Sequence, residues 1–258
     1  MLENFEGIRV LVNADDFLLA GSVDHAIIQL FKEGAISNTT AMMCLPQSVQ
    51  SLSELKYSIN TYKIGVHLQL TSGKPILKDV LSLIDRKTQS FAPKENLSNT
   101  RADEVEREWR AQIDLFCRVI GHPPSHLDSH HGPHRLSHLL PIYLKLASEF
   151  GVPVRGGTLA LGKQISMLGC RSTAICTSDW TGRGQSSEKL MEKVLHVFSV
   201  EGPTTLEIVT HPSLFDPELR KISSLNDTRF NDYSELRRFR ELVDSEPKVK
   251  MYSYEAKQ

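Results

Sequence analysis

Acidic and histidine side chains follow the short β-branched runs of this chain at several distant places. Asp15 and Asp16 come just after the first run, His67 stands near the end of the third, and His130 stands at the end of the fourth. Two neutral imidazoles and one carboxylate on one side of a divalent cation leave positions open for water and substrate. We therefore interpret Asp16, His67 and His130 as candidate metal ligands. The alternative is that an aspartate caps the next helix and that His67 is a buried core histidine.

Histidine is concentrated in one segment, residues 126–134, which holds four of the ten histidines of the chain. Imidazole is a common metal ligand and a common acid–base group. His130, at the strand end, is the expected ligand, and His134 is expected to line a substrate groove. The remaining histidines of this region fit packing or solvent-exposed roles: His126, His131 and His138.

The adjacent carboxylates of Asp15 and Asp16 should leave the strand in different directions, so one can bind a cation while the other takes part in proton transfer. A bound metal lowers the pKa of water from about 15.7 toward about 7, which makes hydroxide available near neutral pH. No G-x-S-x-G motif occurs and none of the four cysteines has an obvious partner, so water is the expected nucleophile. His211 ends the run at 204–210, where it could protonate a leaving group or simply cap the strand.

Two further polar positions could contact a substrate. Arg155 could orient a catalytic carboxylate or hold a substrate oxygen with two hydrogen bonds, and a purely structural pairing with an aspartate is the alternative. Trp180, next to Asp179, could stack on a sugar ring, although a buried tryptophan anchor is the more common outcome.

These side chains need a scaffold that brings distant segments together. Short β-branched runs alternate with amphipathic stretches, which predicts parallel strands joined by crossover helices, an α/β fold in which the carboxyl ends of the strands meet. Residues 71–99 carry no regular pattern and are interpreted as a lid or a substrate-side insertion. The predicted strands are 8–13, 38–43, 63–70, 125–129, 153–155, 173–178, 204–210 and 249–254. The predicted helices are 22–32, 48–57, 100–120, 140–150, 187–198 and 233–244.

Composition is that of an ordinary globular protein. The 258 residues are 40% hydrophobic and 24% charged, with a formal net charge of -1, which argues against a nucleic-acid partner and a membrane partner. No apolar run approaches the roughly 18 residues of a membrane span, and acidic residues occupy the N-terminal stretch where a signal peptide would be basic. The scattered cysteines fit a reducing compartment, so we expect a cytoplasmic protein. A chain of this length fits one α/β barrel domain.

Four sequence blocks occur in order along the chain: Asn13-Ala14-Asp15-Asp16-Phe17, Gly65-Val66-His67-Leu68 with Leu70-Thr71, His126-Leu127-Asp128-Ser129-His130-His131, and Thr210-His211-Pro212. Together they resemble the YdjC-like family of carbohydrate deacetylases. This resemblance implies a distorted (β/α) TIM-like barrel, a single domain over residues 1–258, one divalent cation (magnesium or zinc), and hydrolytic removal of an acetyl group from an N-acetylated sugar.

By position, the resemblance makes Asp16, His67 and His130 the metal ligands, Asp15 the general base and His211 the general acid. It implies a small oligosaccharide substrate such as diacetylchitobiose, with or without a phosphate. Two departures from the family pattern concern the substrate groove. Leu18 stands where the family usually has glycine, and Gly132-Pro133 replaces what is often a third histidine and a hydrophobic residue.

Two other functions use the same residues differently. A hydrolase of phosphorylated β-disaccharides such as cellobiose phosphate would need two carboxylates flanking a glycosidic bond, and Asp15 with Asp128 is the plausible pair. A catalytically silent sugar-binding protein would need a damaged metal site, which the intact ligands argue against. Imidazole ligands favour zinc over magnesium. A homodimer is expected because barrel enzymes commonly dimerise.

Overall fold

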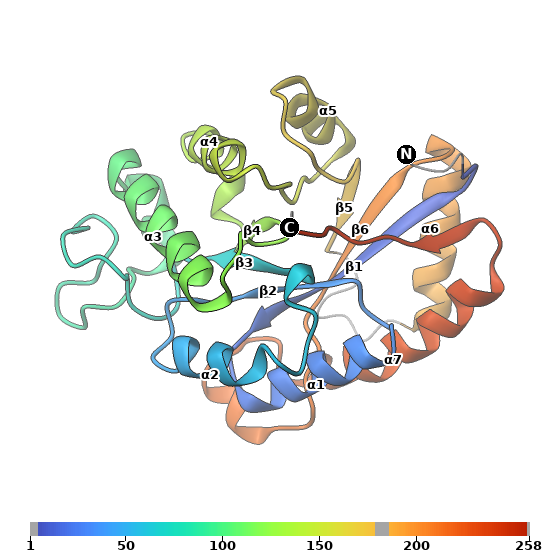
Figure 1. Ribbon diagram of the computed structural model, residues 1–258, viewed down its shortest axis with the longest axis horizontal. Helices are drawn as coiled ribbons and strands as arrows, with labels where there is room; N and C mark the ends of the chain where they lie inside the picture. Colours follow the sequence, from blue (N-terminus) through green and yellow to red (C-terminus); the bar gives the residue numbers. More distant parts are fainter. Residues whose placement is uncertain (1–4, 179–185, 257–258) are drawn as a thin grey trace.

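The computed structural model describes residues 5–178 and 186–256, and within them seven strands form one parallel sheet (Figure 1). The strand order is β4-β3-β2-β1-β6-β5, and β7 pairs with the first residues of β1. The bounds are β1 (Ile8–Phe17), β2 (Asn38–Ala41), β3 (Ile64–Leu68), β4 (Leu127–Ser129), β5 (Ile175–Thr177), β6 (Thr205–Thr210) and β7 (Val249–Met251).

The sheet curls back on itself through two single-residue bridges. Val154 bridges Leu127 of β4 on one side and Ser172, just before β5, on the other. The predicted strand at 153–155 therefore contributes one paired residue and no more, in part because Pro153 has no N–H to donate. The result is the distorted (β/α) barrel that the resemblance implied, in a single α/β domain.

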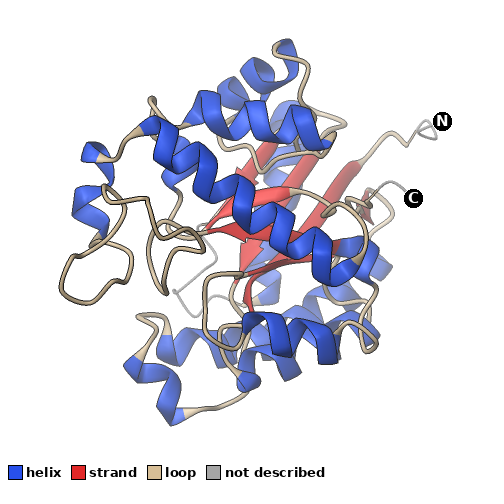
Figure 2. Cartoon of the chain, turned by 60° about the vertical axis from the view of Figure 1, so that its left-hand side comes forward, coloured by secondary structure: helices blue, strands red, loops and turns tan. Residues whose placement is uncertain are grey.

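Helices lie around the outside of the sheet (Figures 1 and 2). Among the described residues they are α1 (Gly21–Lys32), α2 (Ser48–Leu55), α3 (Ala102–Ile120), α4 (Leu140–Phe150), α5 (Leu159–Met167), α6 (Ser187–Glu201) and α7 (Asn226–Ser245), with short 3-10 turns η1 (Thr61–Lys63), η2 (Lys94–Asn99), η3 (Pro133–Arg135) and η4 (Pro217–Lys221). The sequence did not predict α5, whose internal Gly162 weakens the helical pattern. A Cβ at Gly162 would lie 2.6 Å from the carbonyl oxygen of Ala174, so close packing requires the glycine.

The two faces of β1 differ in chemistry. Val10, Val12 and Ala14 are fully buried in the apolar core. Asn13 and Asp15 point to the opposite face, where they hydrogen-bond to each other and to polar side chains of neighbouring strands. The interior of the curled sheet is therefore polar, because alternate residues of a strand face opposite sides.

Residues 71–99 are irregular up to η2, as the sequence indicated. The segment packs beside α3 and is held by two buried carboxylates of that helix (Figure 1). Glu108 accepts hydrogen bonds from the backbone N–H groups of Ile76 and Leu77, both at 3.0 Å, and Glu104 accepts one from Ser82 at 2.7 Å. Ser72, at the start of the segment, also lines the cavity described below.

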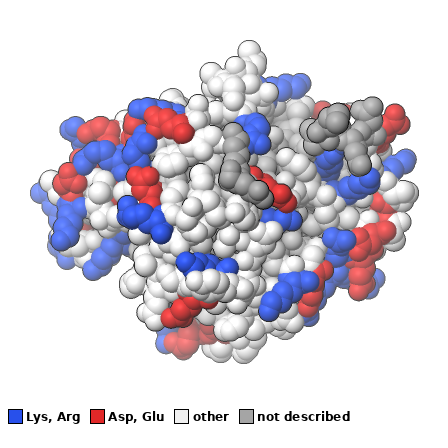
Figure 3. Space-filling model, in the orientation of Figure 1, with Lys and Arg blue, Asp and Glu red and all other residues white. Residues whose placement is uncertain are grey.

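The described residues contain no helix that is both long and apolar enough to cross a membrane. On the face shown in Figure 3, Lys and Arg side chains alternate with Asp and Glu side chains around a largely uncharged centre. This mixture agrees with the near-zero net charge of the chain.

Candidate metal centre and active site

One cavity of about 300 Å³ opens at the carboxyl ends of the strands. Its walls come from the end of β1, from β3, and from the segments that follow β4 and β6. The predicted site residues among the described part of the chain all line it: Asp15, Asp16, His67, His130, His134, Arg155 and His211. Trp180, predicted to bind substrate, lies outside the described residues, as does Asp179.

The three predicted ligands place one donor atom each around a common point. Asp16 Oδ1 lies 3.4 Å from His67 Nε2 and 3.0 Å from His130 Nδ1. Two ligands that each sit about 2.1 Å from one ion are about 3.0 Å apart at a right angle and about 3.4 Å apart at the tetrahedral angle. The spacing of these donors therefore fits a single divalent cation.

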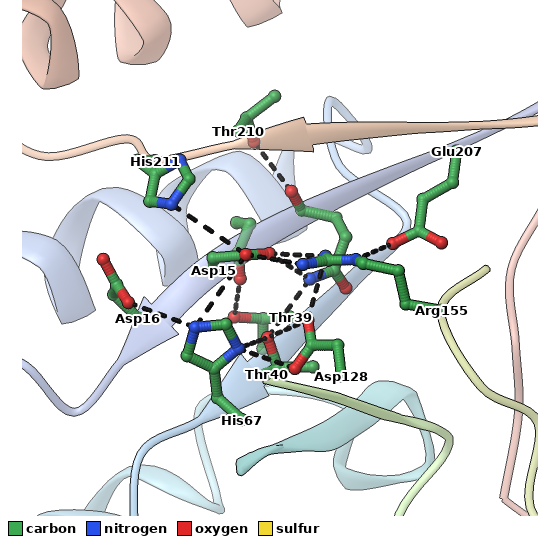
Figure 4. Close-up of polar contacts among 12 residues, drawn as sticks. Asp15, Asp16, Thr39, Thr40, His67, Asp128, Arg155, Glu207, Thr210 and His211 are labelled. Atoms are coloured by element: carbon green, nitrogen blue, oxygen red, sulfur yellow. Dashed lines mark hydrogen bonds and ion pairs between the residues drawn. The ribbon is translucent and has the colours of Figure 1, made fainter. Parts of the chain in front are cut away.

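The backbone of β1 explains how the adjacent carboxylates of Asp15 and Asp16 point in different directions. The strand continues to Phe17 instead of ending at Asn13, with a shift of its pairing register between Ala14 and Phe17. At Asp16 φ is 68°, a left-handed conformation that costs energy for a residue with a side chain. This turn separates the carboxylate of Asp16, which approaches His67 from one side, from that of Asp15, which is bound by Arg155 (Figure 4).

The orientation of His67 is set by Asp128, from the neighbouring strand. His67 Nδ1 lies 2.6 Å from Asp128 Oδ1, so this nitrogen donates to Asp128 and Nε2 faces Asp16 (Figure 4). Burial by itself would lower the pKa of His67, but the carboxylates of Asp128 and Asp15 raise that pKa to about 10. The surroundings of this imidazole thus stabilise positive charge, as a cation site requires.

His130 and its neighbour His131 are held by two hydroxyl groups from the end of the β3 segment. Ser72 Oγ lies 3.2 Å from His130 Nε2, which leaves Nδ1 facing Asp16. Thr71 Oγ1 lies 2.9 Å from His131 Nδ1. His131 is exposed, as expected, yet its ring lies 3.9 Å from that of His130 and forms part of the cavity rim.

A second acidic group, Asp15 with His67 and Asp128, also brings three donor atoms close together. Arg155 occupies this group: its guanidinium binds both oxygens of Asp15, at 2.7 and 2.6 Å, and lies 2.9 Å from Asp128 Oδ2. A fixed positive charge among the donors opposes a metal ion there. Of the two candidate groups, the one around Asp16 is therefore the better fit to a metal ion.

Arg155 sits at the centre of a buried charge network. Beyond the two aspartates, its Nε donates to Glu207 Oε1 at 2.5 Å (Figure 4). Glu207 Oε2 accepts a hydrogen bond from Thr173. The guanidinium therefore holds the carboxylate of Asp15, a contact expected both for a residue that orients a catalytic carboxylate and for a purely structural ion pair. Its predicted contact with substrate stays a prediction. Glu207 was not predicted, although a charged residue within a β-branched run is an available signal.

Asp15 and His211 lie on opposite sides of a small gap. Asp15 Oδ2 is 3.9 Å from His211 Nε2 and 3.9 Å from His67 Nε2. Burial raises the pKa of Asp15, but Arg155 outweighs that effect, so the pKa is lowered and the carboxyl group is ionised. Burial lowers the pKa of His211 to about 4, so this imidazole is neutral at pH 7.

His134 is a buried part of the cavity wall. Its Nδ1 lies 2.5 Å from Ser129 Oγ and its ring stacks on Tyr143 at 4.8 Å. Its Nε2 has no hydrogen-bond partner among the described residues. Burial lowers the pKa of His134 to about 3, so it is a neutral side chain.

Arg229 is a site residue that the sequence did not reveal. It lies on α7 and its Nη2 donates to Asp16 Oδ2 at 2.5 Å, across 213 positions of the chain. The cluster holds more buried carboxylates than buried guanidinium groups, so part of its negative charge is left for His67 or for a cation to balance. The carboxylates are Asp15, Asp16, Asp128 and Glu207, and the guanidinium groups are those of Arg155 and Arg229.

Each departure from the family pattern includes one residue with left-handed backbone, Leu18 in the first and Gly132 in the second. Leu18 has φ of 78°, its side chain is fully buried, and its N–H donates to Asp24 Oδ1 at 2.7 Å. Leu18 does not line the cavity, whereas Gly132, with φ of 73°, does. Of the two departures, the change at Gly132 bears on the shape of the groove.

Comparisons with known proteins agree with one another. A family model described as YdjC-like protein matches residues 9–248. The carbohydrate deacetylase of Oceanobacillus iheyensis is 36% identical over 228 residues, which cover 86% of this chain and 93% of that relative. The chitooligosaccharide deacetylase of Yersinia enterocolitica is 32% identical over 215 residues, which cover 80% of this chain and 82% of that relative. One similar crystal structure is of a protein from Enterococcus faecalis V583 named as a candidate cellobiose-phosphate cleavage protein. It has a TM-score of 0.86 and 28% sequence identity, and the match covers 96% of this chain and 98% of that one.

Proposed function

This chain belongs to the YdjC-like family, and we propose that it is a metal-dependent carbohydrate deacetylase. Two of its relatives carry the names carbohydrate deacetylase and chitooligosaccharide deacetylase. The observation that carries the proposal is the spacing of Asp16 Oδ1, His67 Nε2 and His130 Nδ1 in the same cavity as Asp15 and His211. The reaction is hydrolysis of an acetamide, which yields acetate and a free amino sugar.

The residues present fit a divalent cation, held by Asp16, His67 and His130. Such an ion would supply a Lewis acid that polarises the acetamide carbonyl and lowers the pKa of the attacking water. Two imidazole donors and one carboxylate favour zinc or another transition ion over magnesium, which prefers oxygen ligands.

Asp15 is the proposed general base. The two hydrogen bonds from Arg155 fix the plane of its carboxylate, and Oδ2 points toward His67 and His211. This oxygen can accept a proton as a water oxygen attacks the acetamide carbon, which forms the new C–O bond. Arg155 keeps the carboxylate ionised, although the same interaction makes it a weaker base.

His211 is the proposed general acid. When the C–N bond breaks, the leaving nitrogen needs a proton, and His211 Nε2 lies on the opposite side of the gap from Asp15. Because His211 is neutral at pH 7, it must first gain a proton, and the one that Asp15 took from water is the nearest source. Asp15 and His211 thus carry one proton from water to amine.

The proposed substrate is a small N-acetylated oligosaccharide such as N,N'-diacetylchitobiose, with or without a phosphate. His134 and Trp180 are the proposed substrate contacts, together with Arg155. The cytoplasmic location, the absence of nucleic-acid and membrane partners, and the homodimer stay predictions.

Cleavage of a phosphorylated β-disaccharide is the second candidate, favoured only by the name of the E. faecalis structure. It would need two carboxylates placed on either side of a glycosidic bond. Asp15 Oδ1 and Asp128 Oδ2 instead bind the same nitrogen of Arg155, at 2.6 and 2.9 Å. The Arg155 nitrogen therefore lies between the two carboxylates and occupies the place where a glycosidic bond would have to fit.

Acetate release separates these functions. Purified protein is incubated with N,N'-diacetylchitobiose or with cellobiose phosphate, with and without EDTA, followed by readdition of zinc or magnesium. We expect acetate from the first substrate, loss of activity with EDTA and recovery with zinc. Sugar release from cellobiose phosphate without any deacetylation, or acetate release that EDTA leaves unchanged, would contradict the proposal.

A further inference from the structure

The two oxygens of the Asp16 carboxylate face different partners. Oδ1 lies toward His67 Nε2 and His130 Nδ1, at 3.4 and 3.0 Å. Oδ2 accepts a hydrogen bond from Arg229 Nη2 at 2.5 Å. A charge-assisted contact of this length engages the second oxygen, so a metal ion is offered only the first.

Arg229 is fixed from several directions. Its side chain is 2% exposed, its Nε donates to Ser223 Oγ at 3.0 Å, and its carbonyl oxygen accepts from the N–H of Ser213. Its Nη1 has no hydrogen-bond partner among the described residues. The positive charge of this guanidinium is therefore directed mainly at Asp16, and the side chain has little freedom to leave it.

A cation in this place has two effects on a metal site. The guanidinium occupies one carboxylate oxygen of Asp16, which prevents a metal ion from binding both oxygens. Its positive charge also repels a metal ion nearby. Both effects weaken metal binding. They also keep coordination positions open, and a catalytic metal needs such positions for water and substrate.

We propose that Arg229 is a positioning residue that restricts Asp16 to one metal-binding oxygen and so exchanges metal affinity for open coordination positions. The inference rests on the metal site of the proposed function and names a residue that controls it. The alternative role for this contact is an ion pair that ties α7 to β1. The two roles predict opposite changes in metal affinity when Arg229 is replaced, because loss of a purely structural ion pair would disturb Asp16 and weaken metal binding.

The test compares Arg229→Met with Arg229→Lys and the wild type. Zinc affinity is measured by competition with a chromophoric chelator, and the visible absorption of the cobalt-loaded proteins reports the coordination number. We expect Arg229→Met to bind zinc about tenfold more tightly, because a charge is removed next to the ion. We expect weaker cobalt absorption, which indicates more ligands, and a lower kcat for acetate release. Arg229→Lys, which keeps the charge, should stay closer to the wild type in affinity.

Arg238→Met is the matched control, since Arg238 lies on the same helix but is exposed and pairs with Glu188. Its zinc affinity should not change. Equal or weaker zinc binding by folded Arg229→Met, with an unchanged cobalt spectrum, would overturn the inference. If Arg229→Met does not fold by circular dichroism, Arg229→Gln carries the same prediction, since it also removes the charge. A wild type that binds no zinc or cobalt would instead count against the metal site of the proposed function.

Discussion

His67 and Asp128 are register partners on neighbouring parallel strands, and His67 Nδ1 lies 2.6 Å from Asp128 Oδ1. Asp128 is fully buried and also accepts a hydrogen bond from Thr40 at 2.9 Å. The pairing of β3 with β4 therefore fixes Nδ1 of His67 as the nitrogen that donates to Asp128. Nε2 is directed toward Asp16, where loss of its proton leaves a lone pair for an ion.

Asp128→Asn should reverse this arrangement. The amide of asparagine can donate to His67 Nδ1, which moves the ring proton to Nε2 and removes the lone pair that would bind the ion. We expect zinc affinity to fall about 10- to 100-fold, with a parallel loss of acetate release. Titration of zinc into the two proteins measures this, with the exposed Asp103→Asn as control. Unchanged affinity would mean that Asp128 does not set the tautomer.

His211→Gln separates acid catalysis from metal binding. If His211 protonates the leaving amine, kcat for acetate release should fall about 10²- to 10⁴-fold while zinc affinity changes little. Steady-state kinetics and zinc titration measure the two quantities, and the exposed His196 provides a His→Gln control. Loss of zinc together with activity would make His211 a ligand and leave the acid unassigned.

The left-handed backbone at Leu18 should make a glycine variant more stable than an alanine variant. Both Leu18→Gly and Leu18→Ala lose a fully buried side chain, so both should be less stable than the wild type. At φ of 78° glycine is free of the strain that alanine carries, so Leu18→Gly should be the more stable of the two by roughly 1 kcal/mol. Urea unfolding of the three proteins tests this. A more stable alanine variant would show that position 18 does not hold the left-handed conformation.

Asp24 should give stability a specific pH dependence. Burial raises the pKa of Asp24 to about 6, above the ordinary value near 3.8, so the folded chain holds this proton more tightly than the unfolded chain. The contribution of Asp24 to the free energy of unfolding is therefore fully present below the ordinary pKa and is lost as pH rises through about 6. Between pH 5 and pH 7.5 the wild type should lose roughly 1 kcal/mol relative to Asp24→Asn. Urea unfolding of both proteins at the two pH values measures the difference, and a constant difference would contradict the raised pKa.

The sequence predicts the candidate site best where acidic or histidine residues stand at the ends of predicted strands. Asp16, His67 and His130 could be chosen because each follows a β-branched run, and parallel strands bring their ends together. Glu207 and Arg229 escaped for opposite reasons. Glu207 lies inside a strand that reads as apolar, and Arg229 lies on a helix whose only link to the site is a contact with Asp16 that the fold creates.

Local backbone features were harder to predict than element order. The β-branched run predicts a strand that ends at Asn13, yet β1 continues through Asp15 and Asp16 because polar partners inside the barrel stabilise them there. Helix α5 was missed because Gly162 interrupts its pattern, and only the packing against Ala174 shows why glycine is needed. Both misses reflect tertiary contacts that override local preference.

The metal stoichiometry of the purified protein tests the central claim most directly. We would titrate zinc into metal-free wild type, His130→Ala and His138→Ala, the last being an exposed histidine eight positions further along the chain. Wild type and His138→Ala should each bind one zinc ion per chain, and His130→Ala should bind none with measurable affinity. Full zinc binding by folded His130→Ala would contradict the assignment of Asp16, His67 and His130 to one ion.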